Sequence, residues 1–138
     1  MPTTGKAVVI EPDGTARVID WQYPPPAEGH LQLLYREIQC SLVEAVSLYP
    51  DGADVPGLVE LTLWIDEEGK YNGGEFNPLA TGVVGGLYGA LFPGDYVAGP
   101  ALFTGGVDDE GETQPLDEEA LTLLTSVQLV EERSEGNE

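Results

Sequence analysis

The chain has 138 residues, of which 25 are Asp or Glu and only 5 are Lys or Arg, so its formal net charge at pH 7 is -20. Such a charge disfavours contact with phosphates and anionic lipids, which excludes direct nucleic-acid or membrane binding unless the few cations cluster. The length suits a single domain with a real core, and the 41% hydrophobic content argues against disorder. We therefore expect one folded domain with a basic partner.

The first predicted element is a β-hairpin. Residues 6–10 and 16–20 are short β-branched runs on either side of the sequence Glu-Pro-Asp-Gly-Thr. Proline followed by Asp-Gly supplies the backbone angles of a tight turn, so the two runs are expected to pair as antiparallel strands. The three prolines within residues 22–26 donate no backbone hydrogen bonds, which predicts an extended crossover; a proline-rich ligand is the alternative.

A helix and two further strands are expected before residue 66. In residues 28–39 four side chains recur at i, i+3, i+4 and i+7 and share one helical face, which we assign to the core: Leu31, Leu34, Tyr35 and Ile38. Residues 42–48 form an apolar run that ends at a Tyr-Pro-Asp-Gly turn signal, and residues 58–65 alternate apolar and polar side chains. Both runs predict strands.

Residues 77–92 are rich in glycine, which weakens a helix by about 1 kcal/mol per residue relative to alanine. The segment is therefore either a weak helix packed closely on its neighbours or a folded loop, and we favour a short helix after Asn77-Pro78. A last strand is predicted over residues 95–103, before a break at Gly105-Gly106.

The final residues, 108–138, contain 11 acids and a single base, Arg133, and so carry half of the net charge. Within them, apolar residues recur at steps of three and four: Leu116, Ala120, Leu123, Val127 and Val130. The acids at 117–119 suit the N-terminus of a helix, which favours negative charge. We predict an amphipathic helix over 117–133 followed by a frayed acidic tail, with a strand over 126–130 as the alternative.

No motif in the chain identifies a reaction. There is no HExxH pattern, paired-cysteine motif, Walker lysine loop or GxSxG, and the lone His30 excludes a multi-histidine metal site and suggests a surface or capping role. The single thiol, Cys40, excludes an internal disulfide and is more often a small buried hydrophobe than a nucleophile. We therefore expect no enzyme, cofactor or metal.

One acidic pattern is similar to the ligand spacing of a calcium loop: Asp108, Glu110 and Glu112, with Glu119 at the twelfth position. Thr113 occupies the sixth position, where such a loop requires glycine, and no helix is expected to precede it. A flexible acidic connector is the simpler interpretation.

The charge itself is the remaining functional signal. A compact chain of this length is about 35 Å across, and duplex DNA carries about 20 phosphate charges over that distance. An acidic protein of this size can therefore imitate DNA in the basic groove of a DNA-binding enzyme. The alternative hypothesis needs no partner: the acidic residues serve only to keep the protein soluble or to adapt it to high salt. A salt-adapted protein should unfold when salt is removed, whereas a mimic should stay folded and lose its partner as salt rises.

Four stretches of the sequence resemble a family of small uncharacterised domains found in phages and actinobacteria, the domain of unknown function 3846. They are KAVVIEPDG at 6–14, WIDEEGK at 64–70, NPLAT at 77–81 and GDYVAGP at 94–100, and the resemblance covers about residues 6–104. It implies a phage or mobile-element setting, and hence the cytoplasm of a bacterial host, but no established activity. The acidic C-terminal extension lies outside it.

Three polar residues of the family-like stretches stand among apolar neighbours: Asn77, Thr81 and Asp95. Asn77 suits a helix cap, Thr81 can bond back to a helix carbonyl, and Asp95 can close a turn. If the region forms a pocket instead, these three and the nearby Tyr88 are expected to orient a small ligand through amide and hydroxyl groups.

These observations predict an α+β fold, namely a single domain with a mainly antiparallel sheet of about five strands and two covering helices. Residues 1–107 are expected to form the core, and residues 108–138 an acidic connector and amphipathic helix of the same domain. The N-terminal residues lack the features of a signal peptide, and no apolar run reaches the about 18 residues of a membrane span, so we expect a cytoplasmic protein.

Functionally, we expect a non-enzymatic phage-type accessory protein whose acidic surface binds a basic host protein. The most specific version of this hypothesis is that the protein inhibits a nucleic-acid-acting defence enzyme by DNA mimicry. The acids expected to contact the partner lie in the C-terminal segment: Asp108, Asp109, Glu110, Glu112, Asp117, Glu118 and Glu119. The alternative is a domain that sequesters a nucleotide or signal through Asn77, Thr81, Tyr88 and Asp95.

Overall fold

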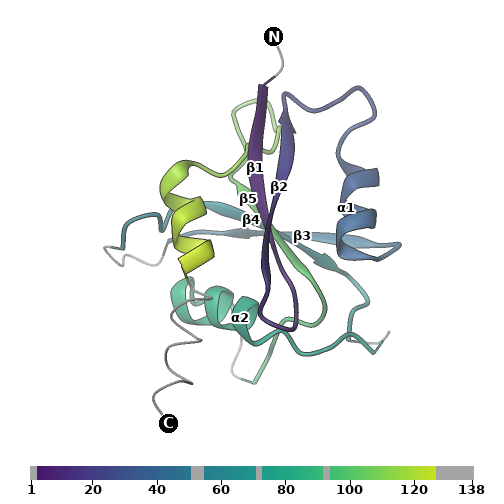
Figure 1. Cartoon of the computed structure of the whole chain (residues 1–138), viewed down its shortest axis with the longest axis vertical. Helices are drawn as coiled ribbons and strands as arrows, with labels where there is room; N and C mark the ends of the chain where they lie inside the picture. The colour runs from purple at the N-terminus through teal and green to yellow at the C-terminus, as the bar shows by residue number, and fades with distance from the viewer. Residues whose placement is uncertain (1–2, 51–54, 71–72, 92–93, 127–138) are drawn as a thin grey trace.

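The chain folds as an antiparallel sheet with helices on both faces, in a computed structural model that describes residues 3–50, 55–70, 73–91 and 94–126 (Figure 1). Its elements in chain order are β1 (Thr3–Ile10), β2 (Ala16–Tyr23), α1 (Leu31–Ile38), β3 (Val43–Leu48), β4 (Leu61–Asp66), α2 (Pro78–Thr81), the π-helix η1 (Gly82–Leu87) and β5 (Ala101–Gly105). A further helix covers residues 118–126. The predicted α+β class and its sheet of five strands are confirmed. None of the helices described is long and apolar enough to cross a membrane.

The sheet has the strand order β2-β1-β5-β4-β3, and every neighbouring pair is antiparallel. The last strand in the sequence therefore lies at the centre, between the first hairpin and the β3–β4 pair. The register aligns apolar residues in a row across the sheet: Val8 is opposite Phe103, which is opposite Leu63, which is opposite Val46. Because side chains in one row point to the same face, this row forms a continuous strip of core.

The first hairpin forms where the sequence predicts it. Glu11 N donates to Thr15 O at 2.8 Å, and Gly14 takes a φ of 92°, which residues with a side chain rarely adopt. The Asp13 carboxylate closes the turn by accepting from Thr15 N at 2.9 Å, and this contact lowers the pKa of Asp13. β2 continues to Tyr23, into the segment that was expected to be a crossover.

Strand β1 is buried on both faces because helices cover the sheet on each side (Figure 1). Val8 and Ile10 belong to a larger core with α2, η1 and the helix at 118–126, whereas Ala7 and Val9 belong to a smaller core with α1. All four side chains are at most 1% exposed. Burial on both faces explains why this strand is apolar at consecutive positions instead of alternating.

Helix α1 is shorter than predicted, and its buried face differs. It begins at Leu31 instead of residue 28, after Gly29 with its φ of 79°. Leu34 and Ile38 are buried as expected. Leu31, the first helical residue, is 45% exposed, so its assignment to the core was wrong, and Leu33 packs on the smaller core instead.

Strand β4 begins at Leu61, later than the predicted residue 58. A turn at residues 55–58 precedes it, in which Leu58 N donates to Val55 O at 3.0 Å, and residues 59–60 are irregular. Val59, which the alternating pattern assigned to a buried face, is 38% exposed.

Strand β5 is Ala101–Gly105, not 95–103 as predicted, and it includes a glycine at which a break was expected. The residues before it pack against 75–77, where Asn77 N donates to Val97 O at 2.9 Å and Gly99 N donates to Glu75 O at 2.7 Å. Gly99 has a φ of 81°, which interrupts an extended strand at this point.

The glycine-rich segment is helical, but it is not one α-helix. α2 continues directly into η1, where Tyr88 N donates to Val83 O at 3.2 Å, five residues back. Val83 and Val84 are buried in the larger core. A β-carbon on Gly85 would lie 3.3 Å from a methyl group of Leu91, so glycine allows a close contact here.

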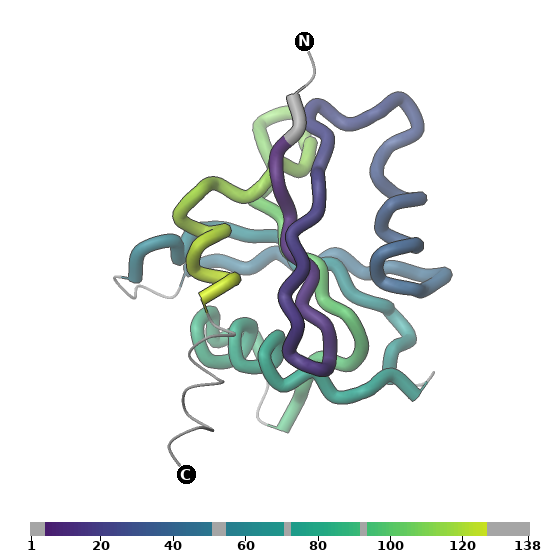
Figure 2. The backbone as a smooth tube through the Cα atoms, in the orientation of Figure 1, coloured from purple at the N-terminus to yellow at the C-terminus, as the bar shows by residue number. Residues whose placement is uncertain are grey.

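Residues 116–126 of the acidic C-terminal segment pack on the larger core, on the side of the sheet away from α1 (Figure 2). Leu116 N donates to Lys6 O at 2.9 Å, and Ala120 and Leu124 are at most 1% exposed. Leu124 is more deeply buried than the predicted Leu123. The predicted helix beyond 126 and most of the alternative strand at 126–130 lie outside the described residues.

Candidate functional site

Two acids of the C-terminal segment hold its backbone in place. The Asp108 carboxylate accepts from Tyr23 Oη at 2.5 Å and from two backbone N–H groups of its own loop at 2.9 Å. The hydrogen bond from Tyr23 is the main reason that the pKa of Asp108 is lowered, and the same bond raises the pKa of Tyr23. The Asp117 carboxylate accepts from Ala120 N at 2.8 Å and so caps the helix at 118–126.

Four other acids of the same segment are exposed, and their side chains make no hydrogen bond or salt bridge with a described residue: Asp109, Glu110, Glu118 and Glu119. Glu112 is half-buried and also makes none within the described chain. The seven acids predicted to contact a partner thus divide into Asp108 and Asp117, which support the fold, and a remainder that is available at the surface.

These acids do not assemble the calcium loop that their spacing suggests. Asp108 directs its carboxylate oxygens to Tyr23 and to backbone amides, and Glu119 lies in the first turn of a helix. In the part of the chain that the structure describes, no group of three or more His, Cys, Asp or Glu could hold a metal ion.

Every basic side chain of the described residues already has an acidic partner. The ion pairs are Lys6–Asp20 at 2.6 Å, Arg17–Glu11 at 2.8 Å, Arg17–Glu37 at 2.9 Å, Arg36–Glu37 at 3.3 Å and Lys70–Asp95. Burial alone would raise the pKa of Glu37, but hydrogen bonds from Arg17 and Arg36 outweigh that effect and lower it. The described cations are therefore committed within the protein, and the remaining carboxylates are not neutralised by them.

Asn77, the first ligand-binding candidate, is fully buried and makes only internal contacts. Its Nδ2 donates to Ile10 O and to Gly99 O, both at 2.8 Å, and its Oδ1 accepts from Ala80 N at 3.1 Å. It caps α2, as the sequence suggested, and also ties that helix to the end of β1 and to the loop before β5.

The other three ligand-binding candidates are only partly brought together. Tyr88 is 4% exposed and donates to Val59 O at 2.6 Å, and burial raises the pKa of its phenol to about 12. Thr81 Oγ1 accepts from Val97 N at 2.9 Å, and among the described residues its hydroxyl makes no bond to a helix carbonyl, contrary to the expectation. Thr81 and Asp95 line one shallow hollow, which neither Asn77 nor Tyr88 lines.

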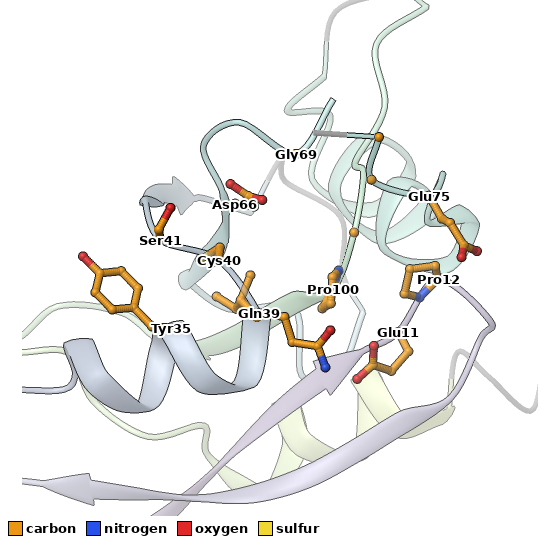
Figure 3. Close-up of a pocket in the computed structure, with 14 residues that line it drawn as sticks. Glu11, Pro12, Tyr35, Gln39, Cys40, Ser41, Asp66, Gly69, Glu75 and Pro100 are labelled. Carbon is orange, nitrogen blue, oxygen red and sulfur yellow. The ribbon is translucent and has the colours of Figure 1, made fainter. Parts of the chain in front are cut away.

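Sequence reasoning missed a hollow of about 710 Å³ at the end of α1 (Figure 3). Its walls come from the hairpin turn at Glu11, the α1 end at 39–41, the end of β4 at Asp66, and loops that carry Glu75 and Pro100. These segments are far apart in the sequence, and no pattern links them. The carboxylates around the hollow make it unsuitable for a phosphate.

The nucleophile and base candidates do not form a catalytic arrangement. Burial, followed by the charge of Asp66, raises the pKa of Cys40, so the thiol stays protonated at neutral pH. The His30 ring stacks on Trp21 at a centroid distance of 3.8 Å, and its Nε2 lies 2.8 Å from Gln22 O. His30 occupies the N-cap position of α1 without a side-chain cap bond.

Comparison with known proteins identifies the family. The model of the family described as Domain of unknown function (DUF3846) matches residues 5–128, so the chain belongs to that family. The match extends beyond residue 104 and covers the described part of the acidic segment, which the sequence resemblance had left outside. No curated protein and no solved structure matched the chain.

Proposed function

We propose that this member of the family is a non-enzymatic accessory protein that binds a basic protein through its acidic surface. One observation carries the proposal. The basic side chains of the described residues are all committed to internal ion pairs, whereas Asp109, Glu110, Glu118 and Glu119 are exposed and unpaired there. A surface with this imbalance attracts cationic partners and raises the rate at which they associate.

The partner that we propose is a nucleic-acid-binding enzyme, which the protein inhibits by DNA mimicry. The support is the match between a net charge of -20 and the about 20 phosphates of duplex DNA over a similar length. The resemblance to phage domains supports a host-defence enzyme in the bacterial cytoplasm as the target.

A non-enzymatic role is supported by the state of the reactive groups. Cys40 has a raised pKa, and the ring of His30 is stacked on Trp21 and hydrogen-bonded to a backbone carbonyl. Neither group is activated in the manner of a nucleophile or a general base.

A small-ligand function has weaker support. A nucleotide phosphate needs a converging pair of cations, and Lys6, Arg17, Arg36 and Lys70 are each paired with a carboxylate. Asn77 and Tyr88, which were to orient the ligand, use their polar atoms inside the fold.

The test is capture of partners from a bacterial lysate on the immobilised protein, at about 50 mM and about 500 mM salt. Under the proposal a basic, nucleic-acid-binding protein is retained at low salt and released at high salt, and short duplex DNA competes for it. If the retained proteins resist high salt or do not bind DNA, the mimicry is refuted.

A matched pair of variants separates a local site from general acidity. The first combines Asp109→Asn, Glu110→Gln, Glu118→Gln and Glu119→Gln. The second neutralises four other exposed acids whose side chains make no hydrogen bond or ion pair with a described residue, through Glu28→Gln, Glu44→Gln, Glu67→Gln and Glu68→Gln. Each exposed charge pair contributes about 0.2–1 kcal/mol, so the first set of substitutions should lower the affinity for the captured partner by about tenfold. An equal loss in the second set would assign binding to the overall charge, not to the C-terminal acids.

A further inference from the structure

Two exposed aromatic rings form a hollow beside Asp95. Phe76 is 56% exposed and Tyr96 is 39% exposed, and their rings pack edge to face with a centroid distance of 5.7 Å. Neither ring belongs to the two hydrophobic cores. The hollow has a volume of about 500 Å³ and is lined by Gly74, Phe76, Thr81, Gly94, Asp95 and Tyr96. Exposed aromatic pairs of this kind are typical of binding surfaces.

One oxygen of the Asp95 carboxylate makes no hydrogen bond within the described chain. Asp95 Oδ1 accepts from Lys70 Nζ and from Tyr96 N, whereas Oδ2 makes no hydrogen bond to a described residue. The contact with Lys70 is the main reason that the pKa of Asp95 is lowered, so the carboxylate is charged at neutral pH. Lys70 Nζ also lies 4.6 Å from the centroid of the Tyr96 ring.

A cation of the protein itself, Lys70, already uses two of these groups. Lys70 makes a cation–π contact with Tyr96 and an ion pair with Asp95, and it lines a neighbouring hollow but not this one. The second ring, Phe76, and the second oxygen of Asp95 are engaged by neither Lys70 nor another described cation. A ring face and a carboxylate together suit a further cation, and a chain with a net charge of -20 attracts one.

We propose that the hollow at Phe76, Tyr96 and Asp95 binds an arginine side chain of the basic partner. The inference rests on the proposed function, because it adds a specific anchor to an otherwise long-range attraction. Arginine fits better than lysine because its planar guanidinium can stack on a ring and donate to both oxygens of a carboxylate. In the complex the arginine competes with Lys70 for Asp95.

The first test compares two peptides of equal length and charge, one rich in arginine and one rich in lysine, by fluorescence anisotropy at about 50 mM salt. The arginine peptide should bind about threefold more tightly, which corresponds to one exposed cation–π contact. Phe76→Leu should remove that preference while keeping an apolar side chain. Tyr49→Leu, at an aromatic side chain that is 62% exposed outside the hollow, should retain it.

The second test compares two variants, each of which removes the lysine partner of one carboxylate. Lys70→Met releases Asp95 beside the aromatic rings, and Lys6→Met releases Asp20, where the lysine makes no cation–π contact with a described ring. Both variants change the net charge equally, so the general attraction rises equally. The proposal requires Lys70→Met to increase the affinity for the arginine peptide by at least about threefold more than Lys6→Met does.

The outcomes separate the two proposals. If both peptides bind with equal affinity and are released by salt, the acidic surface binds cations but the arginine site is wrong. The arginine site is equally refuted if Phe76→Leu keeps the arginine preference while its circular dichroism spectrum is unchanged. If neither peptide binds, both the proposed function and the arginine site are refuted.

Discussion

Replacing Asn77 by alanine should destabilise the protein far more than a surface substitution would. The variant loses the cap on α2, which is worth about 1 kcal/mol, and removes the donor from Ile10 O and Gly99 O. A buried carbonyl without a partner costs about 1–3 kcal/mol. We therefore expect Asn77→Ala to lower the free energy of unfolding by about 4 kcal/mol, a large share of the about 5–15 kcal/mol of a typical domain.

Two further variants separate the contribution of the helix cap from that of the hydrogen bonds to the two carbonyls. Asn77→Ser can still cap α2 but cannot donate to both carbonyls, so it should recover only about 1 kcal/mol of the loss. Asn77→Asp keeps the acceptor for Ala80 N but turns a carboxylate oxygen toward the carbonyls of Ile10 and Gly99. At pH 7 it should therefore be at least as unstable as Asn77→Ala.

The pH dependence of Asn77→Asp has a defined sign. Burial beside two carbonyl oxygens raises the pKa of the introduced carboxyl in the folded protein above its unfolded value of about 3.9. The stability deficit relative to the native sequence should thus shrink as the pH falls through that raised pKa, because the protonated acid can donate to one carbonyl. Urea unfolding at pH 7 and at pH 5 measures both effects. If Asn77→Asp unfolds within about 0.5 kcal/mol of the native protein at pH 7, the side-chain amide is not the donor to these carbonyls.

Four other predictions concern the stability of the fold. Tyr88→Phe should lower the free energy of unfolding by about 1 kcal/mol, because Val59 O loses its donor. In the native protein, the free energy of unfolding should fall as the pH rises from 10 to about 12, because the phenol of Tyr88 ionises at a lower pH in the unfolded chain than in the folded protein. A tyrosinate titration by ultraviolet absorbance in which all six tyrosines ionise near pH 10 would contradict this. Gly57→Ala should cost about 2 kcal/mol or more in chemical unfolding, because φ is 87° and the new β-carbon would lie 2.4 Å from Glu119 O; unchanged stability would mean that the helix at 118–126 does not approach here. The thermal midpoint should rise between about 10 mM and about 150 mM salt as self-repulsion is screened, yet the protein should remain folded at the lower salt, and unfolding there would favour salt adaptation.

The Asn77 prediction also changes how the small-ligand alternative can be tested. Loss of binding in Asn77→Ala cannot distinguish a ligand contact from a damaged fold, because the side chain connects α2, β1 and the loop before β5. Phe76 and Tyr96 are better positions for that question, since both are exposed and lie outside the cores.

Local signals in the sequence were sufficient where the structure is itself local. The turn around Asp13 and Gly14 is closed by contacts within five residues, and the Asn77 cap bonds three residues ahead, so both could be predicted. The beginning of the last strand could not be predicted. Residues 97–99 pair with 75–77 instead of entering the sheet, which depends on a contact between separate segments.

The site was less predictable than the fold for the same reason. Asp108 and Asp109 are adjacent acids, yet one accepts from Tyr23 and two backbone amides while the other is exposed without a described partner. Only the loop conformation distinguishes them. The Phe76–Tyr96 pair joins positions on either side of the glycine-rich helices, and neither residue belongs to a periodic pattern.

The size of the charge argues for a partner over simple solubility. A small domain needs a net charge of magnitude about 2–8 to stay soluble, and further like charges destabilise the folded state by mutual repulsion. The fold uses few of its acids: Asp13, Asp108 and Asp117 shape turns and a helix start, and a small number of others pair with the described cations. The exposed acids that remain contribute repulsion but no described internal contact. A basic protein surface would convert that repulsion into binding energy, because every contact with it neutralises charges that the fold itself leaves unpaired.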